Sequence, residues 1–172
     1  MKTLITNGRF LKLLSVTVLF VICADFLNAQ PELPQRTLTV MPTQALHFGT
    51  FCITGSSGGT VTLNYDGSRS STGDIVLLAM PPLAQPAIFE IKLCQGRNAI
   101  ITFNSTTYLS GSMGSLTLDI GPTEMGGNGA FFQTNNDCDF ITPLRVGGTL
   151  HIPGSATQGT YSGNFEITFN QE

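Results

Sequence analysis

The chain has 172 residues, a formal net charge of −3 and only 11% charged residues. This length is sufficient for one domain with its own hydrophobic core. The few basic residues are scattered, which excludes a nucleic-acid-binding protein, because phosphate contacts need clustered Lys and Arg.

The first 29 residues have the order of a secretory signal peptide. Lys2, Arg9 and Lys12 precede an apolar run from Leu13 to Cys23, and Ala29 follows as a small residue before a cleavage site. The run is well short of the ~20 apolar residues of a transmembrane helix. We therefore expect cleavage after Ala29, secretion to the periplasm or the bacterial cell surface, and no integral membrane segment in the mature chain.

A lipid-modified Cys23 is the alternative for this region. Ile22 disfavours it, because a lipoprotein signal has a small residue at that position. Cleavage leaves residues 30–172 as a single domain. Three basic residues and one acid leave with the peptide, which lowers the net charge from −3 to −5.

The remaining sequence consists of short segments that alternate apolar and polar residues or are rich in β-branched residues, and each ends at Gly, Pro, Asn or Asp. This pattern predicts an all-β protein, either a sandwich or a barrel. The predicted strands are Thr37–Met41, Ala45–Ile53, Thr60–Tyr65, Asp74–Met80, Ala87–Leu93, Ala99–Phe103, Ser115–Ile120, Thr149–Ile152 and Ser162–Asn170.

The segment from Gly121 to Pro143 shows little periodicity and is rich in Gly and Asn. It lies between the predicted strands Ser115–Ile120 and Thr149–Ile152. We expect a long mobile loop there. Long loops in compact domains are often functional, so this segment is a candidate binding surface, although a solvated insertion fits equally well.

Three cysteines follow the signal peptide: Cys52, Cys94 and Cys138. In an oxidising compartment they allow one disulfide and one free thiol. Cys94 ends a predicted central strand and precedes a turn, so we expect it to pair with Cys138 or Cys52, a choice that spacing leaves open.

No residue pattern indicates catalysis or a cofactor. His47 and His151 lie within predicted strands, and neither has a further Cys or His at the spacing of a zinc site. We expect no enzyme activity, no cofactor and no bound metal.

The last predicted strand has one apolar face. Phe165, Ile167 and Phe169 alternate with Glu166 and Thr168, which places the three apolar side chains on the same side. The last strand thus has one apolar face that lines a sheet edge.

Three runs occur in order: ALHFGTF, then GGTVTLNYDGSRSSTGDIVLL, then RVGGTLHIPGSATQGTYSGNFEITF. Together they resemble a family of secreted bacterial pilin-like proteins of the DUF4402 type, whose members resemble chaperone-usher fimbrial subunits. FEIKLC followed by AIITF is similar to the middle strands of those pilins. The resemblance implies an immunoglobulin-like antiparallel β-sandwich whose terminal strand, Tyr161 to Asn170, a periplasmic chaperone binds by strand addition. It makes Phe165, Ile167 and Phe169 the candidate strand-addition face.

The resemblance is incomplete at the other end of the domain. Pilins of that type carry a long donor extension, whereas QPELPQ at residues 30–35 is short and rich in Pro. The protein either accepts a strand without donating one or completes its own sandwich with Leu38 and Val40, and the short tail favours the second.

The function implied is that of a structural or adhesive subunit of a fimbria-like surface assembly, with other subunits or a chaperone as partners. The alternative is a self-contained carbohydrate-binding module. The absence of Trp and the presence of only three Tyr residues count against that alternative, because sugars usually stack on exposed aromatic rings.

Overall fold

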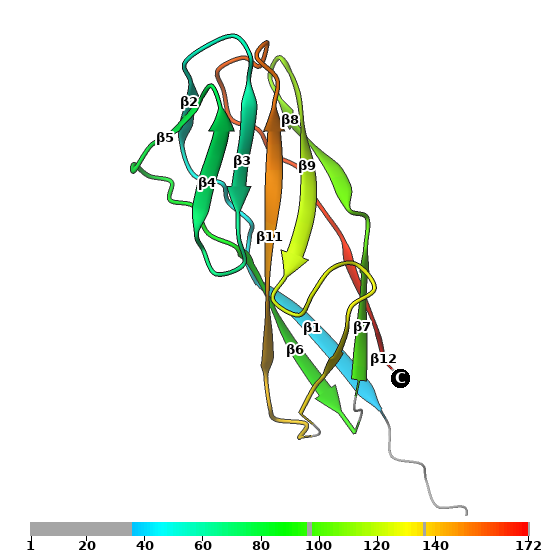
Figure 1. Cartoon of the computed structure of the whole chain (residues 1–172). Coiled ribbons are helices and arrows are strands. Elements are labelled where there is room, and N and C mark those ends of the chain that lie inside the picture. Colours follow the sequence, from blue (N-terminus) through cyan, green and yellow to red (C-terminus); the bar gives the residue numbers. More distant parts are fainter. Residues whose placement is uncertain (1–35, 96–97, 136, 172) are drawn as a thin grey trace, which may run out of the picture. The chain divides into compact units, whose positions relative to one another are not determined.

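The computed structural model describes residues 36–95, 98–135 and 137–171. The predicted signal peptide lies outside the described residues. The described chain is all-β with antiparallel strand pairing, which confirms the fold class at this level (Figure 1). No helix in this part is long and apolar enough to cross a membrane.

The described residues form twelve strands. They are β1 (Thr37–Gln44), β2 (Phe51–Ile53), β3 (Gly59–Leu63), β4 (Arg69–Gly73), β5 (Ile75–Leu77), β6 (Ala87–Cys94), β7 (Asn98–Phe103), β8 (Thr106–Gly111), β9 (Gly114–Thr123), β10 (Phe131–Gln133), β11 (Thr142–Ile152) and β12 (Ile167–Gln171).

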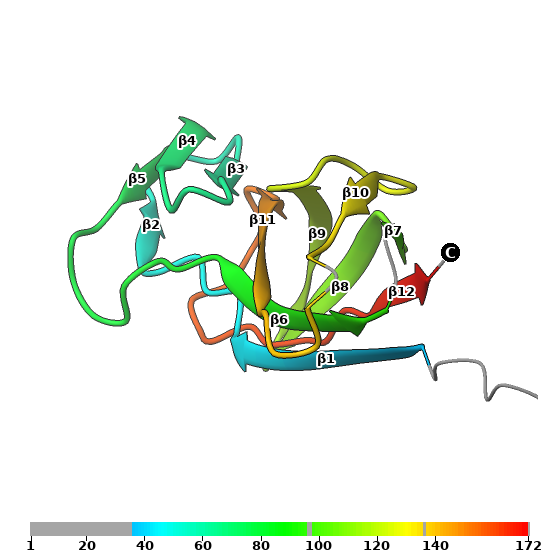
Figure 2. The same cartoon turned by 90° about the horizontal axis from the view of Figure 1, so that it is seen from below.

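Strand β11 organises a seven-stranded sheet. It pairs with β6 along its first half, and with β3 and β9 along its second half. Strands β1, β4 and β8 extend the sheet by pairing with β6, β3 and β9, respectively. Seen from below, this sheet curls into a half-barrel (Figure 2). Two smaller sheets have the orders β10-β7-β12 and β2-β5.

The change of partner along β11 takes place at Gly147 and Gly148. A Cβ atom on Gly147 would overlap the carbonyl oxygen of Leu63. Only Gly allows this close approach of the two backbones. The glycine pair therefore lets one long strand serve two neighbouring groups of strands.

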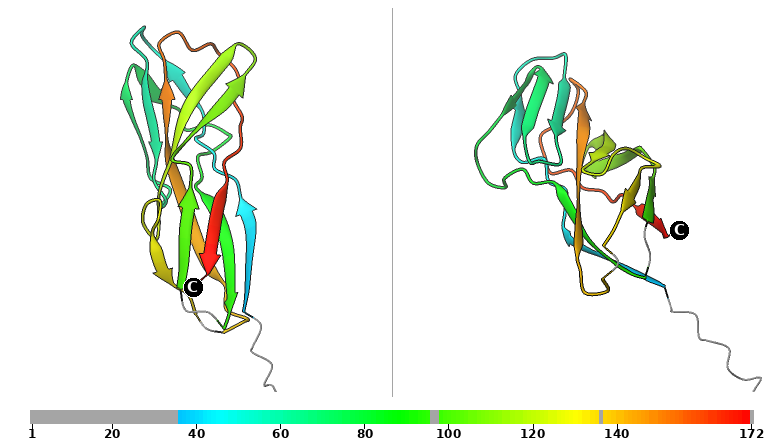
Figure 3. Two further views of the ribbon diagram at one scale, coloured as in Figure 1. Left: turned by 90° about the vertical axis from the view of Figure 1, so that its right-hand side faces the viewer. Right: turned by 60° about the horizontal axis from the view of Figure 1, so that its bottom comes forward.

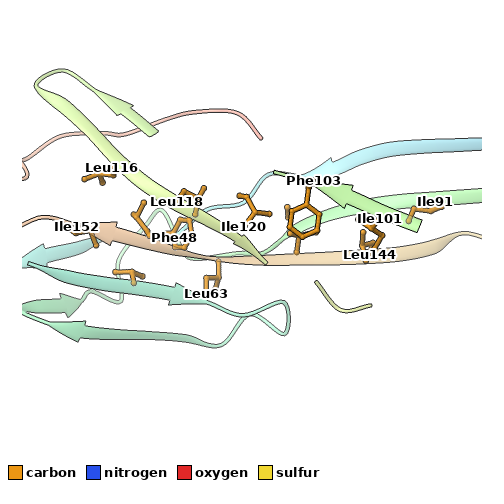
Figure 4. Close-up of a cluster of buried hydrophobic side chains, with 14 of the residues drawn as sticks. Phe48, Leu63, Ile91, Ile101, Phe103, Leu116, Leu118, Ile120, Leu144 and Ile152 are labelled. Carbon is orange, nitrogen blue, oxygen red and sulfur yellow. The ribbon is translucent and has the colours of Figure 1, made fainter. Parts of the chain in front are cut away.

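The hydrophobic core follows β11 along the inner face of the curled sheet (Figure 4). In β9, Leu116, Leu118 and Ile120 are buried and alternate with more exposed polar residues. At the other end, Ile101 of β7 and Leu144 of β11 are fully buried. The alternation places one face of each strand inward, as period-two patterning requires.

Arg69 in β4 links the small β2-β5 sheet to its neighbour. Its Nη1 donates to the carbonyl oxygen of Phe48 at 2.7 Å, and its Nη2 donates to that of Leu78 at 3.0 Å. Phe48 precedes β2 and Leu78 follows β5. One planar guanidinium thus satisfies two chain segments, a geometry that Lys cannot reproduce.

The disulfide joins Cys94 to Cys138, one of the two pairings that the sequence left open. Cys94 is the last residue of β6, and Cys138 lies in the segment between β10 and β11. Their Cα atoms are 4.2 Å apart. Cys52 has a free, half-buried thiol in β2.

The expected mobile loop from Gly121 to Pro143 needs correction. Residues 131–133 form β10, which pairs with β7, and β11 begins at Thr142, well before the expected start at Thr149. Three residues are too few for a periodic signal, and the Gly147–Gly148 pair interrupted the alternation that continues through Leu144 and Val146.

Other strand boundaries also differ from the prediction. Strands β4 and β8 were not expected, because RSSTG and TTYLSG are polar and have little apolar alternation. The predicted strands at 45–53 and 162–170 are shorter in the structure, where β2 covers Phe51–Ile53 and β12 covers Ile167–Gln171. In both cases the missing part is a loop that makes only single bridges.

Candidate functional site

An open groove of about 470 Å³ lies between β1 and the C-terminal segment that includes β12. Figure 3 shows these two strands running beside one another, with β6 behind the space between them. The groove is lined by Leu38, Val40 and Pro42 of β1, Phe89 of β6, and Phe165, Glu166, Ile167 and Phe169 of the C-terminal segment. The volume is within the ~300–1,000 Å³ range of ligand sites.

Both walls of the groove are sheet edges. Among the described residues, β1 pairs only with β6, and β12 pairs only with β7. Each strand therefore presents one row of unpaired backbone N–H and C=O groups. The groove combines an apolar lining with two unpaired backbone edges.

Aromatic rings from the floor and from the C-terminal wall pack against each other. Phe89 lies with its ring centroid 6.2 Å from that of Phe165, at an interplanar angle of 77°, and 6.2 Å from that of Phe169. The pair of Phe89 and Phe165 is edge-to-face, a geometry that contributes about 0.5–1.5 kcal/mol beyond burial. All three rings remain half-buried, so part of this apolar surface faces the groove.

Two polar side chains belong to this region. Glu166 is exposed and is the one charged residue among those that line the groove in the described part of the chain. Gln171 follows Phe169 on the same face of β12, and its Nε2 is buried without a hydrogen-bond partner among the described residues. The C-terminal segment thus has one charged residue beside the groove and an unused donor beyond its apolar residues.

The predicted apolar face is present in the structure, where Phe165, Ile167 and Phe169 all line the groove. Leu38 and Val40 were expected to complete the sandwich. In the structure they belong to the opposite wall and make no backbone pairing with β12. Their alternation within β1 signalled an apolar face but gave no information about what lay opposite.

A second surface feature is the outward face of the curled sheet, which we call the hydroxyl face. Residues directly opposite each other on paired strands share a face, and the register across β4, β3, β11, β9 and β8 aligns two polar rows. The rows are Thr72, Thr60, His151, Thr117, Tyr108 and Ser70, Thr62, Thr149, Asp119, Thr106.

The hydroxyl face is held by side-chain hydrogen bonds. His151 Nε2 lies 2.7 Å from Asp119 Oδ2, and Thr106 Oγ1 donates to Asp119 Oδ1 at 2.8 Å. The contact with His151, followed by that with Thr106, holds the pKa of Asp119 below its usual value. At one edge, Tyr108 is 63% exposed. Sequence reasoning missed this face, because strand register alone brings its members together.

The two histidines that were considered for metal binding lie apart in different roles. His47 accepts a hydrogen bond at Nδ1 from the backbone N–H of Gly49 at 2.9 Å, which stabilises a turn, whereas His151 belongs to the hydroxyl face. Within the described ranges, no group of three or more His, Cys, Asp or Glu residues has the arrangement of a metal site.

Comparison with known proteins gives one match. Residues 38–170 match the family model described as "Domain of unknown function (DUF4402)". The chain matches none of the curated proteins and none of the solved structures compared with it. The matched range begins in β1 and ends in β12, so it includes both walls of the groove.

Proposed function

The chain belongs to the DUF4402 family, and we propose that it is a structural or adhesive subunit of a fimbria-like bacterial surface assembly. In this proposal the groove between β1 and β12 accepts an extended segment of a neighbouring subunit or of a periplasmic chaperone. The observation that carries the proposal is an apolar groove bounded by two unpaired strand edges.

The chemistry of the groove favours a peptide over other ligands. A small apolar molecule would satisfy the lining, but it would leave the backbone groups of β1 and β12 without partners. An extended peptide supplies main-chain donors and acceptors to both edges, while its alternate side chains enter the apolar space. The strand of the partner would join the two sheets at the place where they are open.

The fold supports the same proposal. In this proposal, the curled sheet and the β10-β7-β12 sheet form an immunoglobulin-like, pilin-like sandwich that lacks a strand between β1 and β12. Soluble proteins rarely leave two apolar edges side by side, because such edges promote aggregation. A subunit whose groove is filled by a strand of its neighbour has a physical reason to leave these two edges unpaired.

The disulfide supports an extracytoplasmic location, because disulfides persist mainly in oxidising compartments. Cys94–Cys138 lies at the end of β6, the strand that forms the groove floor. Secretion and surface exposure are consistent with a subunit that matures outside the cytoplasm.

The proposal is tested by supplying the missing strand. A donor segment with alternating Leu or Val and Thr is fused behind the C-terminus through a Gly/Ser linker long enough to reverse direction. At an effective concentration of ~100 Kd the donor stabilises the fold by about 2.7 kcal/mol. This corresponds to a rise in Tm of roughly 10 °C for a domain of this size.

The control donor has the same composition with its apolar residues placed consecutively, so that they cannot all face the floor. We expect it to leave Tm nearly unchanged. Equal effects of both donors, or no effect of either, would contradict strand acceptance.

A second candidate function, carbohydrate binding, rests on the hydroxyl face. Its rows contain many Thr and Ser hydroxyls, a single Asp119–His151 pair and the exposed ring of Tyr108. This surface suits a neutral polyhydroxylated partner better than a charged one. Binding to neutral polysaccharides that is lost in Tyr108→Ala, with the donor response intact, would favour it.

A further inference from the structure

One row of the hydroxyl face crosses five adjacent strands, which lie side by side in Figure 1 in the order β4-β3-β11-β9-β8. Each member is directly opposite the next in strand register, and the members are Tyr108, Thr117, His151, Thr60 and Thr72. Four intervals of ~4.8 Å between neighbouring strands make the row about 19 Å long. A single sugar ring would cover only a fraction of this length.

The hydroxyl groups of the face keep unused hydrogen-bonding capacity. Thr60 Oγ1 and Thr72 Oγ1 are 2.7 Å apart and share one hydrogen bond. Since each hydroxyl has one donor and two acceptor sites, this pair still offers one donor and three acceptor sites. The carboxylate of Asp119 contacts His151 and Thr106 and keeps further lone pairs. A partner whose own hydroxyls both donate and accept hydrogen bonds matches such a surface.

Charge and shape narrow the choice of partner. Neither row contains the Lys or Arg that would favour a phosphate or another acidic group, and the Asp119 carboxylate repels such a group. Tyr108, at one end, is exposed and presents an apolar ring on which the C–H face of a sugar can stack. The outer face of the curled sheet is convex (Figure 2). A flexible chain can follow this curvature, whereas a flat crystalline surface would touch only a few strands.

We infer that the hydroxyl face binds a flexible chain of neutral sugars that lies across the strands, from Tyr108 at one end to Thr72 at the other. One sugar stacks on Tyr108, and the hydroxyls of Thr117, Thr60 and Thr72 bond successive units. This inference rests on carbohydrate binding, the second candidate under the proposed function, and it adds the size of the ligand and its direction. The groove contributes none of these residues, so strand acceptance is independent of it.

The test measures the affinity of the whole chain for oligomers of glucose, mannose and galactose, from the monosaccharide to the hexasaccharide. Oligomers of galacturonate are the acidic comparison. For a neutral series that binds, we expect affinity to rise with each added unit until the oligomer spans the row and then to level off. The galacturonate series should bind worst, because its carboxylates meet Asp119.

Variants at the two ends of the row separate a chain from a single sugar. Tyr108→Ala should weaken binding at every length, whereas Thr72→Val should weaken it only for oligomers long enough to reach β4. Loss of one hydrogen bond corresponds to about two- to tenfold in affinity. Thr39→Val is the matched control, because Thr39 is exposed on β1 and belongs to neither row. This variant loses the same hydroxyl and should keep the affinity of the parent chain.

The outcomes separate the proposals. If no neutral series binds, carbohydrate binding and the extended ligand are both wrong, and the fused donor decides strand acceptance separately. If the monosaccharide binds as well as the hexasaccharide, or if Thr72→Val has no effect at any length, carbohydrate binding stands and the extended ligand is wrong. If Tyr108→Ala also leaves the affinity unchanged, the hydroxyl face is not the site of sugar binding.

Discussion

Removal of the Cys94–Cys138 disulfide should lower stability by an amount that the closed loop determines. The two cysteines are 44 residues apart. Cross-linking across such a loop lowers the entropy of the unfolded chain by about 13 cal/mol/K, which corresponds to about 4 kcal/mol at 25 °C. Total stabilities of domains are only ~5–15 kcal/mol. The bond therefore accounts for a substantial fraction of the free energy of unfolding.

The perturbation is the double variant Cys94→Ala/Cys138→Ala. Cys138 is exposed and Cys94 is half-buried, so little core packing is lost with the sulfur atoms. Urea unfolding should give a loss of about 3–4 kcal/mol and a larger m-value, because the unfolded chain without the cross-link exposes more surface. Cys52→Ala is the control, since it leaves the disulfide intact.

A loss below ~1 kcal/mol in the double variant would refute the loop-closure reasoning. The pairing itself would be wrong if peptide mapping under non-reducing conditions found Cys52 in the disulfide. A loss in Cys52→Ala as large as in the double variant would also contradict it, because that thiol is free in the structure.

Three further substitutions test individual contacts. Arg69→Lys should destabilise by about 1–3 kcal/mol in urea unfolding, because one ammonium cannot serve two separated carbonyls. Asp119→Asn should cost at most ~1 kcal/mol near pH 5. The pKa of Asp119 is lowered in the fold, so its carboxylate contributes to the free energy of unfolding above the unfolded-state pKa of ~4. That contribution is lost as the pH falls through the folded-state pKa. The difference from the parent should then vanish in strong acid, and pH-dependent unfolding measures this. Gly147→Ala should destabilise by about 1–3 kcal/mol through overlap with backbone, whereas Gly127→Ala, which has open space around its Cβ, should be neutral.

Strong alternation made part of the fold predictable. The segments now seen as β1, β6 and β7 were placed within a few residues of their bounds, because apolar residues occupy every second position along most of each strand. The same rule placed Phe165, Ile167 and Phe169 on one face. The local sequence pattern was sufficient to predict features that depend on a single strand.

The groove itself required long-range information. Leu38 and Phe169 lie near opposite ends of the described chain, and no local signal states that their strands are neighbours without being paired. The hydroxyl face has the same origin, since cross-strand register alone aligns Thr62 with Thr149. The spacing of the three cysteines likewise could not identify Cys138 as the disulfide partner of Cys94. Each of these features depends on how distant strands meet.

The position of β11 has a consequence for the biosynthesis of the protein. Strands β3, β6 and β9 all pair with residues 142–152. While the ribosome is still translating the preceding part of the chain, these three strands lack their shared neighbour. The main sheet can therefore form only after most of the polypeptide has been synthesised, and contacts this distant in sequence form slowly. A nascent chain in that state still lacks its main sheet, and a translocation channel can thread only a chain that has not folded.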